Sequence, residues 1–240
     1  MTIAQEINPQ TGICQDVIFP PSDIYSDEPP LESELHLEQI MLLLQCLKWL
    51  WRERNDFYAA GNLTIYYSPH QRKSEFFRGP DFFVVLGCDR RSRKSWVVWE
   101  EHGKYPNVIV EILSPSTAST DKNLKKTIYQ DTFRTPDYFW FDLDTLELVG
   151  FHLLDGEYQP LQPNEQGHLW SQQLGLYLGV YEGLLRYFTP DHQLVPTLEE
   201  ATQQAQQQVQ QAQQQVQQAQ QQAERLAAKL RELNIDPDTI

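Results

Sequence analysis

One short segment of this chain, residues 107–115, carries a single carboxylate in the middle of an uninterrupted apolar run. Such a run is typical of a strand that is buried on both faces at the centre of a sheet. Burying an ionised carboxylate without a partner is very unfavourable, so Glu111 must be paired, protonated or bound to a metal ion. The residues alone leave two interpretations open: a structural ion pair with a nearby Lys or Arg, or a functional site.

A second carboxylate stands at the start of another apolar strand. Asp81 follows Gly79 and Pro80 and opens the run 82–86. Asp beside Gly-Pro is also an ordinary turn residue, which is the structural alternative. Two strand-borne carboxylates together can converge on one hard cation, because Mg²⁺ is typically held by one or two carboxylates with water and substrate phosphate.

The next helix supplies a lysine. Asp121, Lys125 and Tyr129 are four residues apart and therefore share one helix face. One interpretation is a solvated basic face with an Asp121–Lys125 pair. The other is that Lys125 reaches back toward Glu111 and orients or polarises a water molecule.

The order of elements predicts an α/β or α+β domain with a mixed sheet over residues 31–190. A leucine-rich helical pattern begins at Leu31 and is expected to end at Gly61-Asn62, and residues 120–134 are expected to form a second helix. Residues 1–30, rich in Pro, Asp and Ser, are expected to be an extended, poorly ordered leader, and 191–197 a linker. Strands are expected at 63–67, 81–86, 96–99, 108–113, 138–141, 146–153 and 184–188.

The C-terminal segment differs in kind. From Leu198 to Leu233, apolar or small residues alternate at spacings of four and three, with mainly Gln between them. This heptad pattern predicts a coiled coil over 198–233, followed by a tail at 234–240, and favours a homodimer. The alternative is a Gln-rich low-complexity segment without stable structure.

Charge and cysteine content narrow the function classes. The net charge of −14 speaks against a protein that coats nucleic acid through bulk charge. Residues 72–94 are locally basic, and they predict either a backbone-binding face or a solvated loop that protects a hairpin edge. Three scattered cysteines, no secretory signal and no long apolar span favour the reducing cytoplasm. The bases of the expected loop are Arg90, Arg91, Arg93 and Lys94.

Together, these residues resemble a family of restriction-endonuclease-like proteins that is expanded in photosynthetic bacteria. The resemblance covers residues 31–190 and rests on the combination of motifs rather than on any one of them. It implies the PD-(D/E)XK nuclease fold, an α/β core with a mixed sheet flanked by helices, and metal-dependent phosphodiester hydrolysis. The motifs are Pro80-Asp81, the stretch 110–117, Asp121, Lys125, Tyr129, and Asp137-Tyr138 to Asp142.

Carried over by position, the resemblance makes Asp81 and Glu111 metal ligands. The lysine of the motif is expected two residues after Glu111, where this chain has Leu113, and the resemblance offers Lys125 on the following helix as the substitute. The extra acid that many nucleases of this fold carry on the first helix matches Glu34. Glu34 is therefore the predicted catalytic residue of this helix, and His36 is the neighbouring candidate.

The leading hypothesis is a metal-dependent endonuclease that acts on nucleic acid, with DNA favoured. Asp81 and Glu111 would bind one or two Mg²⁺ ions, for which Mn²⁺ is a substitute, and Lys125 would position or deprotonate the attacking water. The rival hypothesis is an inactive nuclease-like scaffold that works as an oligomeric interaction or regulatory protein. A third is a small-molecule enzyme with Glu111 as its base.

Overall fold

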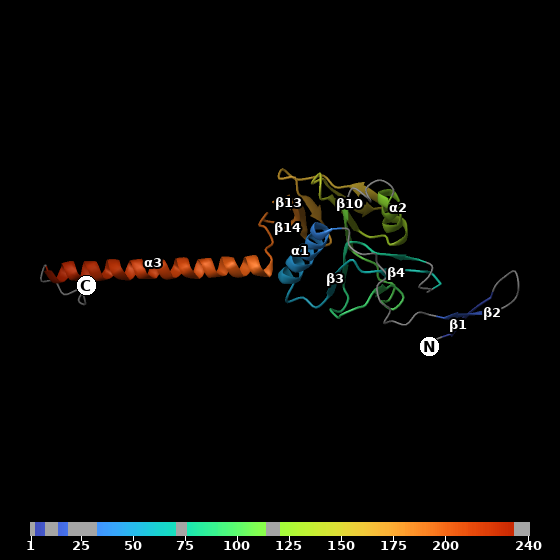
Figure 1. The fold of residues 1–240 in the computed structure, drawn as a ribbon, viewed down its shortest axis with the longest axis horizontal. Helices are drawn as coiled ribbons and strands as arrows, with labels where there is room; N and C mark the ends of the chain where they lie inside the picture. The colour runs from blue at the N-terminus through green and yellow to red at the C-terminus, as the bar shows by residue number, and fades with distance from the viewer. Residues whose placement is uncertain (1–2, 8–13, 19–32, 71–75, 114–120, 233–240) are drawn as a thin grey trace. The chain divides into compact units, whose positions relative to one another are not determined.

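The computed structural model describes residues 3–7, 14–18, 33–70, 76–113 and 121–232 (Figure 1). The chain divides into two compact units, Met1–Val195 and Pro196–Ile240. Each unit is described by itself below.

A six-stranded mixed sheet organises the first unit. Its central strand β8 (Val108–Leu113) is buried at every residue. It runs antiparallel to β6 (Phe82–Leu86) on one side and parallel to β9 (Asp137–Asp142) on the other. The expected α/β architecture with a mixed sheet is therefore confirmed. The sheet order is β11-β10-β9-β8-β6-β3, with β3 at Phe57–Gly61, β10 at Leu148–Leu154 and β11 at Glu157–Pro160.

Helix α1 (Glu34–Leu50) and a small sheet cover one face of this mixed sheet. The residues of β8 at 108, 110 and 112 point into this layer because successive side chains of a strand alternate between faces. Figure 1 shows α1 beside β14 and β3, and α1 contacts both strands. The small sheet consists of β12 (Leu169–Ser171), β13 (Leu176–Tyr181) and β14 (Leu184–Phe188).

A second set of elements covers the opposite face, to which Ile109 and Glu111 belong. Helix α2 (Asp121–Thr127) continues into the π-helical turn η1 (Ile128–Thr132), as the helical pattern over 120–134 predicts. Aromatic rings fill this second core, among them Phe83, Trp96 and Tyr129. A three-stranded sheet completes the layer, with β4 at Ile65–Tyr66, β5 at Phe77–Arg78 and β7 at Trp96–Val97.

The first helix is shorter than the sequence predicts. It ends at Leu50, with Trp51 as its C-cap, and residues 57–61 form the edge strand β3 instead of more helix. The ring of Trp51 packs edge-on against Phe57 at 5.0 Å, which turns the chain back onto the sheet. Asn62, at φ 46°, follows β3 rather than the helix.

The predicted leader contains paired strands. Strand β1 (Ile3–Ile7) pairs antiparallel with β2 (Cys14–Ile18), so these parts are not unstructured as expected. The rest of that segment lies outside the described residues. Alternation between apolar and polar residues is weak in both strands, which explains why the sequence pattern did not predict them.

In the second unit, one long helix, α3 (Leu198–Glu232), covers nearly all of the predicted heptad segment. It begins with a capping box. The Thr197 amide donates to Oε2 of Glu200 at 2.7 Å, and the Glu200 amide donates to the Thr197 hydroxyl at 3.1 Å. Pairing of this helix with a second copy stays a prediction. Among the described residues, no helix is long and apolar enough to span a membrane.

Gln39 provides a test of how α1 is attached to the small sheet. Its buried amide donates to the Leu185 carbonyl at 2.9 Å and accepts from the Leu185 amide at 2.8 Å. Gln39→Leu leaves both backbone groups of Leu185 unpaired, so we expect a loss of about 2 kcal/mol or more in the free energy of unfolding. Urea denaturation checks this, with Gln45→Leu on the exposed side of α1 as the matched control. Equal losses in both variants would contradict it.

Candidate active site

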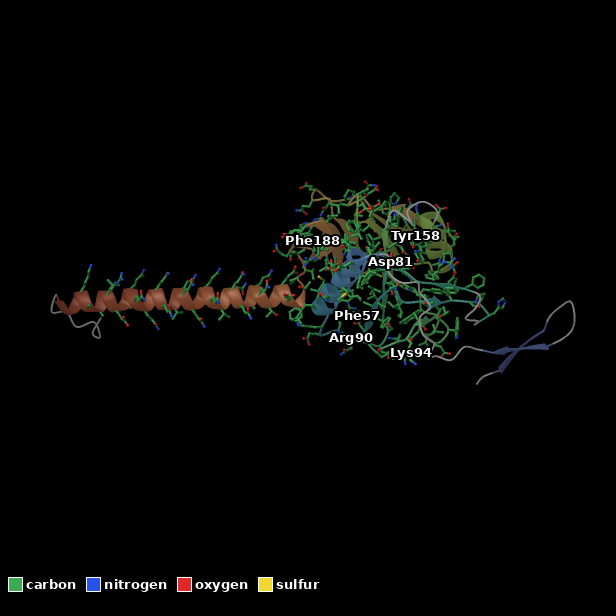
Figure 2. The ribbon with its side chains drawn as sticks, in the orientation of Figure 1. Phe57, Asp81, Arg90, Lys94, Tyr158 and Phe188 are labelled. Atoms are coloured by element: carbon green, nitrogen blue, oxygen red, sulfur yellow. The ribbon has the colours of Figure 1, made fainter. Side chains whose placement is uncertain are left out.

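Asp81 and Glu111 lie opposite each other on neighbouring strands. Phe82 pairs with Val110 in the antiparallel β6–β8 register, so the next pair outward is Asp81 with Glu111. Directly opposite residues of an antiparallel pair point to the same face of a sheet. Oδ2 of Asp81, which is labelled in Figure 2, also accepts a hydrogen bond of 2.7 Å from the backbone amide of Ile112. The structure thus brings the two predicted carboxylates together.

Glu111 is enclosed by α2 and η1. Only 2% of the residue is exposed. The Tyr129 hydroxyl donates a hydrogen bond of 2.6 Å to Oε1, and Nζ of Lys125 donates to Oε2 at 3.1 Å. Tyr129 stands in the π-helical turn, a conformation that occurs frequently at functional sites. Of the three residues predicted to share this helix face, the side chain of Asp121 lies outside the described part.

The carboxyl group of Glu111 is strongly perturbed. Burial, and next the negative charge of Asp81, raise the pKa of Glu111 to about 8, while Lys125 and the Tyr129 hydrogen bond act in the opposite direction. Burial and the charge of Glu111 raise the pKa of Tyr129 well above its ordinary value. In the metal-free chain, Glu111 therefore holds a proton at neutral pH. Strongly perturbed carboxyl groups of this kind cluster at functional sites.

The carboxylate pair fits a hard divalent cation. Two acids face each other, and a cation between them would relieve the charge repulsion that raises the pKa of Glu111. Asp81 and Glu111 offer only oxygen donors, as Mg²⁺ prefers. Within the described ranges, no cluster of three or more His, Cys, Asp or Glu side chains suited to a metal occurs. A cation here would therefore take water and substrate oxygens as its other ligands.

Of the two first-helix candidates, the structure brings His36 to the carboxylates. His36 is buried, and its Nε2 lies 3.2 Å from Oδ1 of Asp81. The backbone amide of His36 donates to the N-cap hydroxyl of Ser33 at 3.1 Å, which fixes the first turn of α1. Glu34 is exposed in that turn and, among the described residues, contacts neither carboxylate.

The ammonium group next to Glu111 comes from a helix rather than from the strand itself. Leu113 lies two residues after Glu111 on β8, and it therefore points to the same face of the sheet. Its apolar side chain is buried there and supplies no charge. The ammonium group instead comes from α2, through the 3.1 Å contact between Lys125 and Glu111.

With this geometry established, comparisons with known proteins identify the family. A family model described as "Uma2: Putative restriction endonuclease" matches residues 23–187. The chain belongs to the Uma2 family. The match begins before α1 and extends nearly to the end of β14, the last strand of the small sheet.

Two further proteins are similar to this chain. An uncharacterized protein of Synechocystis sp. is 31% identical over 105 residues, which span 42% of this chain and about half, 53%, of that protein. A crystal structure of a putative nuclease belonging to DUF820 from Anabaena variabilis shows 13% identity and a TM-score of 0.42. It covers 71% of this chain and 83% of the other.

Several bases of the basic segment 72–94 form ion pairs or hydrogen bonds within the chain. Arg93 has a 4% exposed side chain, and it forms ion pairs with Glu101 at 2.5 Å and Asp89 at 2.6 Å. Arg91 also pairs with Glu101, at 3.1 Å. The expectation that Arg93 contacts nucleic acid is therefore wrong: the two acids neutralise its charge and burial removes it from the surface. Arg72 and Lys73 lie outside the described residues.

Arg90 belongs to the same basic segment and is exposed. Its guanidinium donates to the backbone carbonyls of Arg52 and Arg54 and lies 5.1 Å from the ring centroid of Phe57. Figure 2 shows Arg90 and Phe57 on the same side of the domain. Arg91 and Lys94 are exposed as well. This leaves three of the four predicted loop cations at the surface.

A second buried acid lies on the other face of the sheet. Asp137 receives hydrogen bonds from the Ser171 hydroxyl at 2.6 Å and the Gln173 amide at 2.9 Å, and Nδ1 of His152 lies 2.7 Å away. Because Asp137 pairs with Val108 in the β8–β9 register, it points away from Glu111. This cluster attaches β12 to the main sheet. The motif Asp137-Tyr138 thus has a structural explanation.

The raised pKa of Glu111 predicts a pH-dependent stability. Its ordinary pKa is 4.5 and its folded value about 8. The protonated form is favoured in the fold, so the stability it contributes is complete below about pH 4.5 and lost as pH rises through about 8. In EDTA, we expect Glu111→Gln to melt with the wild type near pH 5 and at a higher temperature at pH 9.

Calorimetric melting of both proteins across this pH range checks the prediction. The exposed acid Glu147 provides the matched control, since Glu147→Gln is expected to follow the wild type at each pH. A difference between Glu111→Gln and the wild type that does not change with pH would contradict the raised pKa.

Proposed function

We propose that this Uma2 protein is a metal-dependent endonuclease that hydrolyses phosphodiester bonds of DNA. The observation that carries the proposal is the pair of opposed carboxylates, Asp81 and Glu111, with Lys125 directly beside the buried member. A buried acid with a raised pKa, a second acid and an ammonium group together suit chemistry at an anionic phosphate. Membership in a family whose description reads "Putative restriction endonuclease" supports this choice.

In this proposal, Asp81 and Glu111 hold Mg²⁺, or Mn²⁺ in its place. A bound divalent cation polarises a phosphoryl oxygen and lowers the pKa of bound water. Lys125 donates toward the reacting phosphate or its water, because its ammonium group already lies 3.1 Å from the Glu111 carboxylate. Tyr129 and His36 are positioning residues: the first orients Glu111 and the second orients Asp81.

We also propose that the protein acts as a homodimer through α3. Val209 and Val216 lie one heptad apart, and both are more than half exposed, as is Leu226 further along. An isolated helix with such an apolar stripe gains stability when a second helix covers it. A dimer would supply two active sites, one for each strand of a duplex.

Plasmid nicking tests the proposed activity. We expect purified protein to nick supercoiled DNA with Mg²⁺ or Mn²⁺ and not with EDTA. Asp81→Asn and Glu111→Gln should lose this activity, and Lys125→Met should lower the rate by roughly 100-fold or more. Lys126→Met is the matched control, because Lys126 lies over the ring of Phe151 at 3.7 Å and does not contact Glu111 among the described residues.

The outcomes separate an enzyme from a scaffold. Each variant is first shown by thermal melting to be folded. Nicking that survives both carboxylate substitutions would contradict the proposed site. No nicking of duplex or single-stranded DNA with either cation would contradict the nuclease, and it would favour the inactive scaffold with α3 as its working part.

A further inference from the structure

An aromatic cavity lies on the same face of the sheet as Glu111. It has a volume of about 650 Å³, within the usual range of small-ligand sites, and its lining combines residues of the β4-β5-β7 layer with two residues of η1. Of the residues that the structure describes, four aromatic side chains and one cationic side chain line it. These residues are Tyr67, Phe76, Trp99, Tyr105 and Arg78.

Packed rings connect the cavity to the candidate active site. Phe133 contacts Tyr67 at 4.8 Å and Tyr105 at 5.0 Å, and on its other side it contacts Tyr129 at 5.4 Å. Tyr129 in turn donates its hydroxyl hydrogen bond to Glu111. Along the chain, Arg78 precedes Asp81 by only three residues. Two packed rings, Phe133 and Tyr129, therefore link the cavity lining to Glu111.

The chemistry of the lining selects a flat, unsaturated and anionic ligand. Phe76 is 44% exposed and, with Tyr67 at 5.8 Å, offers ring surface for stacking. Trp99 adds a further partly buried ring to this lining. Among the described residues of the lining, Arg78 is the one that carries a charge, so an accompanying negative group is favoured.

We propose that this cavity receives a nucleobase that has left the stack of its strand, with Arg78 contacting the adjoining phosphate. Aromatic stacking serves this purpose in proteins that bind single-stranded nucleic acid. The inference rests on the proposed nuclease and specifies its substrate class: DNA with unpaired bases near the cleavage position. In this arrangement, the extruded base would stack in the cavity, and the sugar-phosphate backbone of the same strand would lie at Asp81 and Glu111.

Fluorescence of 2-aminopurine tests the cavity without any cleavage. Single-stranded DNA of about 12 nucleotides with one central 2-aminopurine is titrated with full-length protein in EDTA, beside its fully paired duplex. We expect the single strand to bind more tightly and its fluorescence to be quenched by stacking. Phe76→Ala should weaken binding by roughly ten-fold, the effect of losing one base–aromatic stack.

Phe77→Ala is the matched control. Phe77 is 39% exposed, lies next in sequence, packs toward Tyr66 at 6.2 Å and does not line the cavity. This variant should bind as the wild type does. Trp99→Phe keeps a ring in the lining, so quenching should persist. Arg78→Gln should reduce the salt dependence of binding by about one phosphate contact.

The results separate this inference from the proposed function. Metal-dependent nicking together with unquenched 2-aminopurine, or with equal binding by Phe76→Ala and Phe77→Ala, would overturn the cavity assignment and leave the nuclease intact. Quenching that Phe76→Ala loses, in a protein that cuts no DNA, would support the cavity and contradict the nuclease. A single strand that binds no more tightly than its duplex would also overturn the inference.

Discussion

A carboxylate on the most buried strand is the constraint on which the rest of this structure depends. Only 2% of Glu111 is exposed, so the free energy of its charged form depends on the groups that the fold places beside it. These are Asp81 from β6, Lys125 from α2 and Tyr129 from η1. Two of these groups stabilise the charged form, while burial and Asp81 oppose it. The balance leaves a proton on Glu111 at neutral pH, which a divalent cation between the acids would displace.

The buried polar groups on the two faces of the mixed sheet have different surroundings. On one face, Gln39 and Asp137 are fully buried polar groups with complete hydrogen bonding, and they join α1 and β12 to the core. On the other face, the polar groups are arranged around two facing acids, of which Glu111 has a raised pKa, and aromatic rings fill the space around them. A polar group buried with its partners stabilises one arrangement, whereas a strongly perturbed acid beside a second acid is typical of a functional site.

Local patterns predicted the parts of the fold whose sequences are unambiguous. The bounds of β8 and β14 match the apolar runs. The spacing of Lys125 and Tyr129 predicted a shared helix face, and one of its two interpretations directed Lys125 at Glu111, as observed. The same reasoning failed where contacts between residues far apart in the sequence determine the secondary structure or the burial of a side chain. Residues 57–61 are a strand because of the sheet edge they join, and Arg93 is buried because Glu101 and Asp89 fold against it. The choice between Glu34 and His36 depended on the rotation of α1, which sequence spacing alone does not determine.

The central claim is that Asp81 and Glu111 share one divalent cation and that Glu111 gives up a proton when it binds. Calorimetric titration of metal-free protein with Mn²⁺ at pH 7, in buffers of different ionisation enthalpy, measures both binding and proton release. With a pKa of about 8 for Glu111, the account predicts the release of close to one proton per bound cation, and the loss of binding in Asp81→Asn. Mn²⁺ binding without proton release, or binding that Asp81→Asn leaves unchanged, would contradict it.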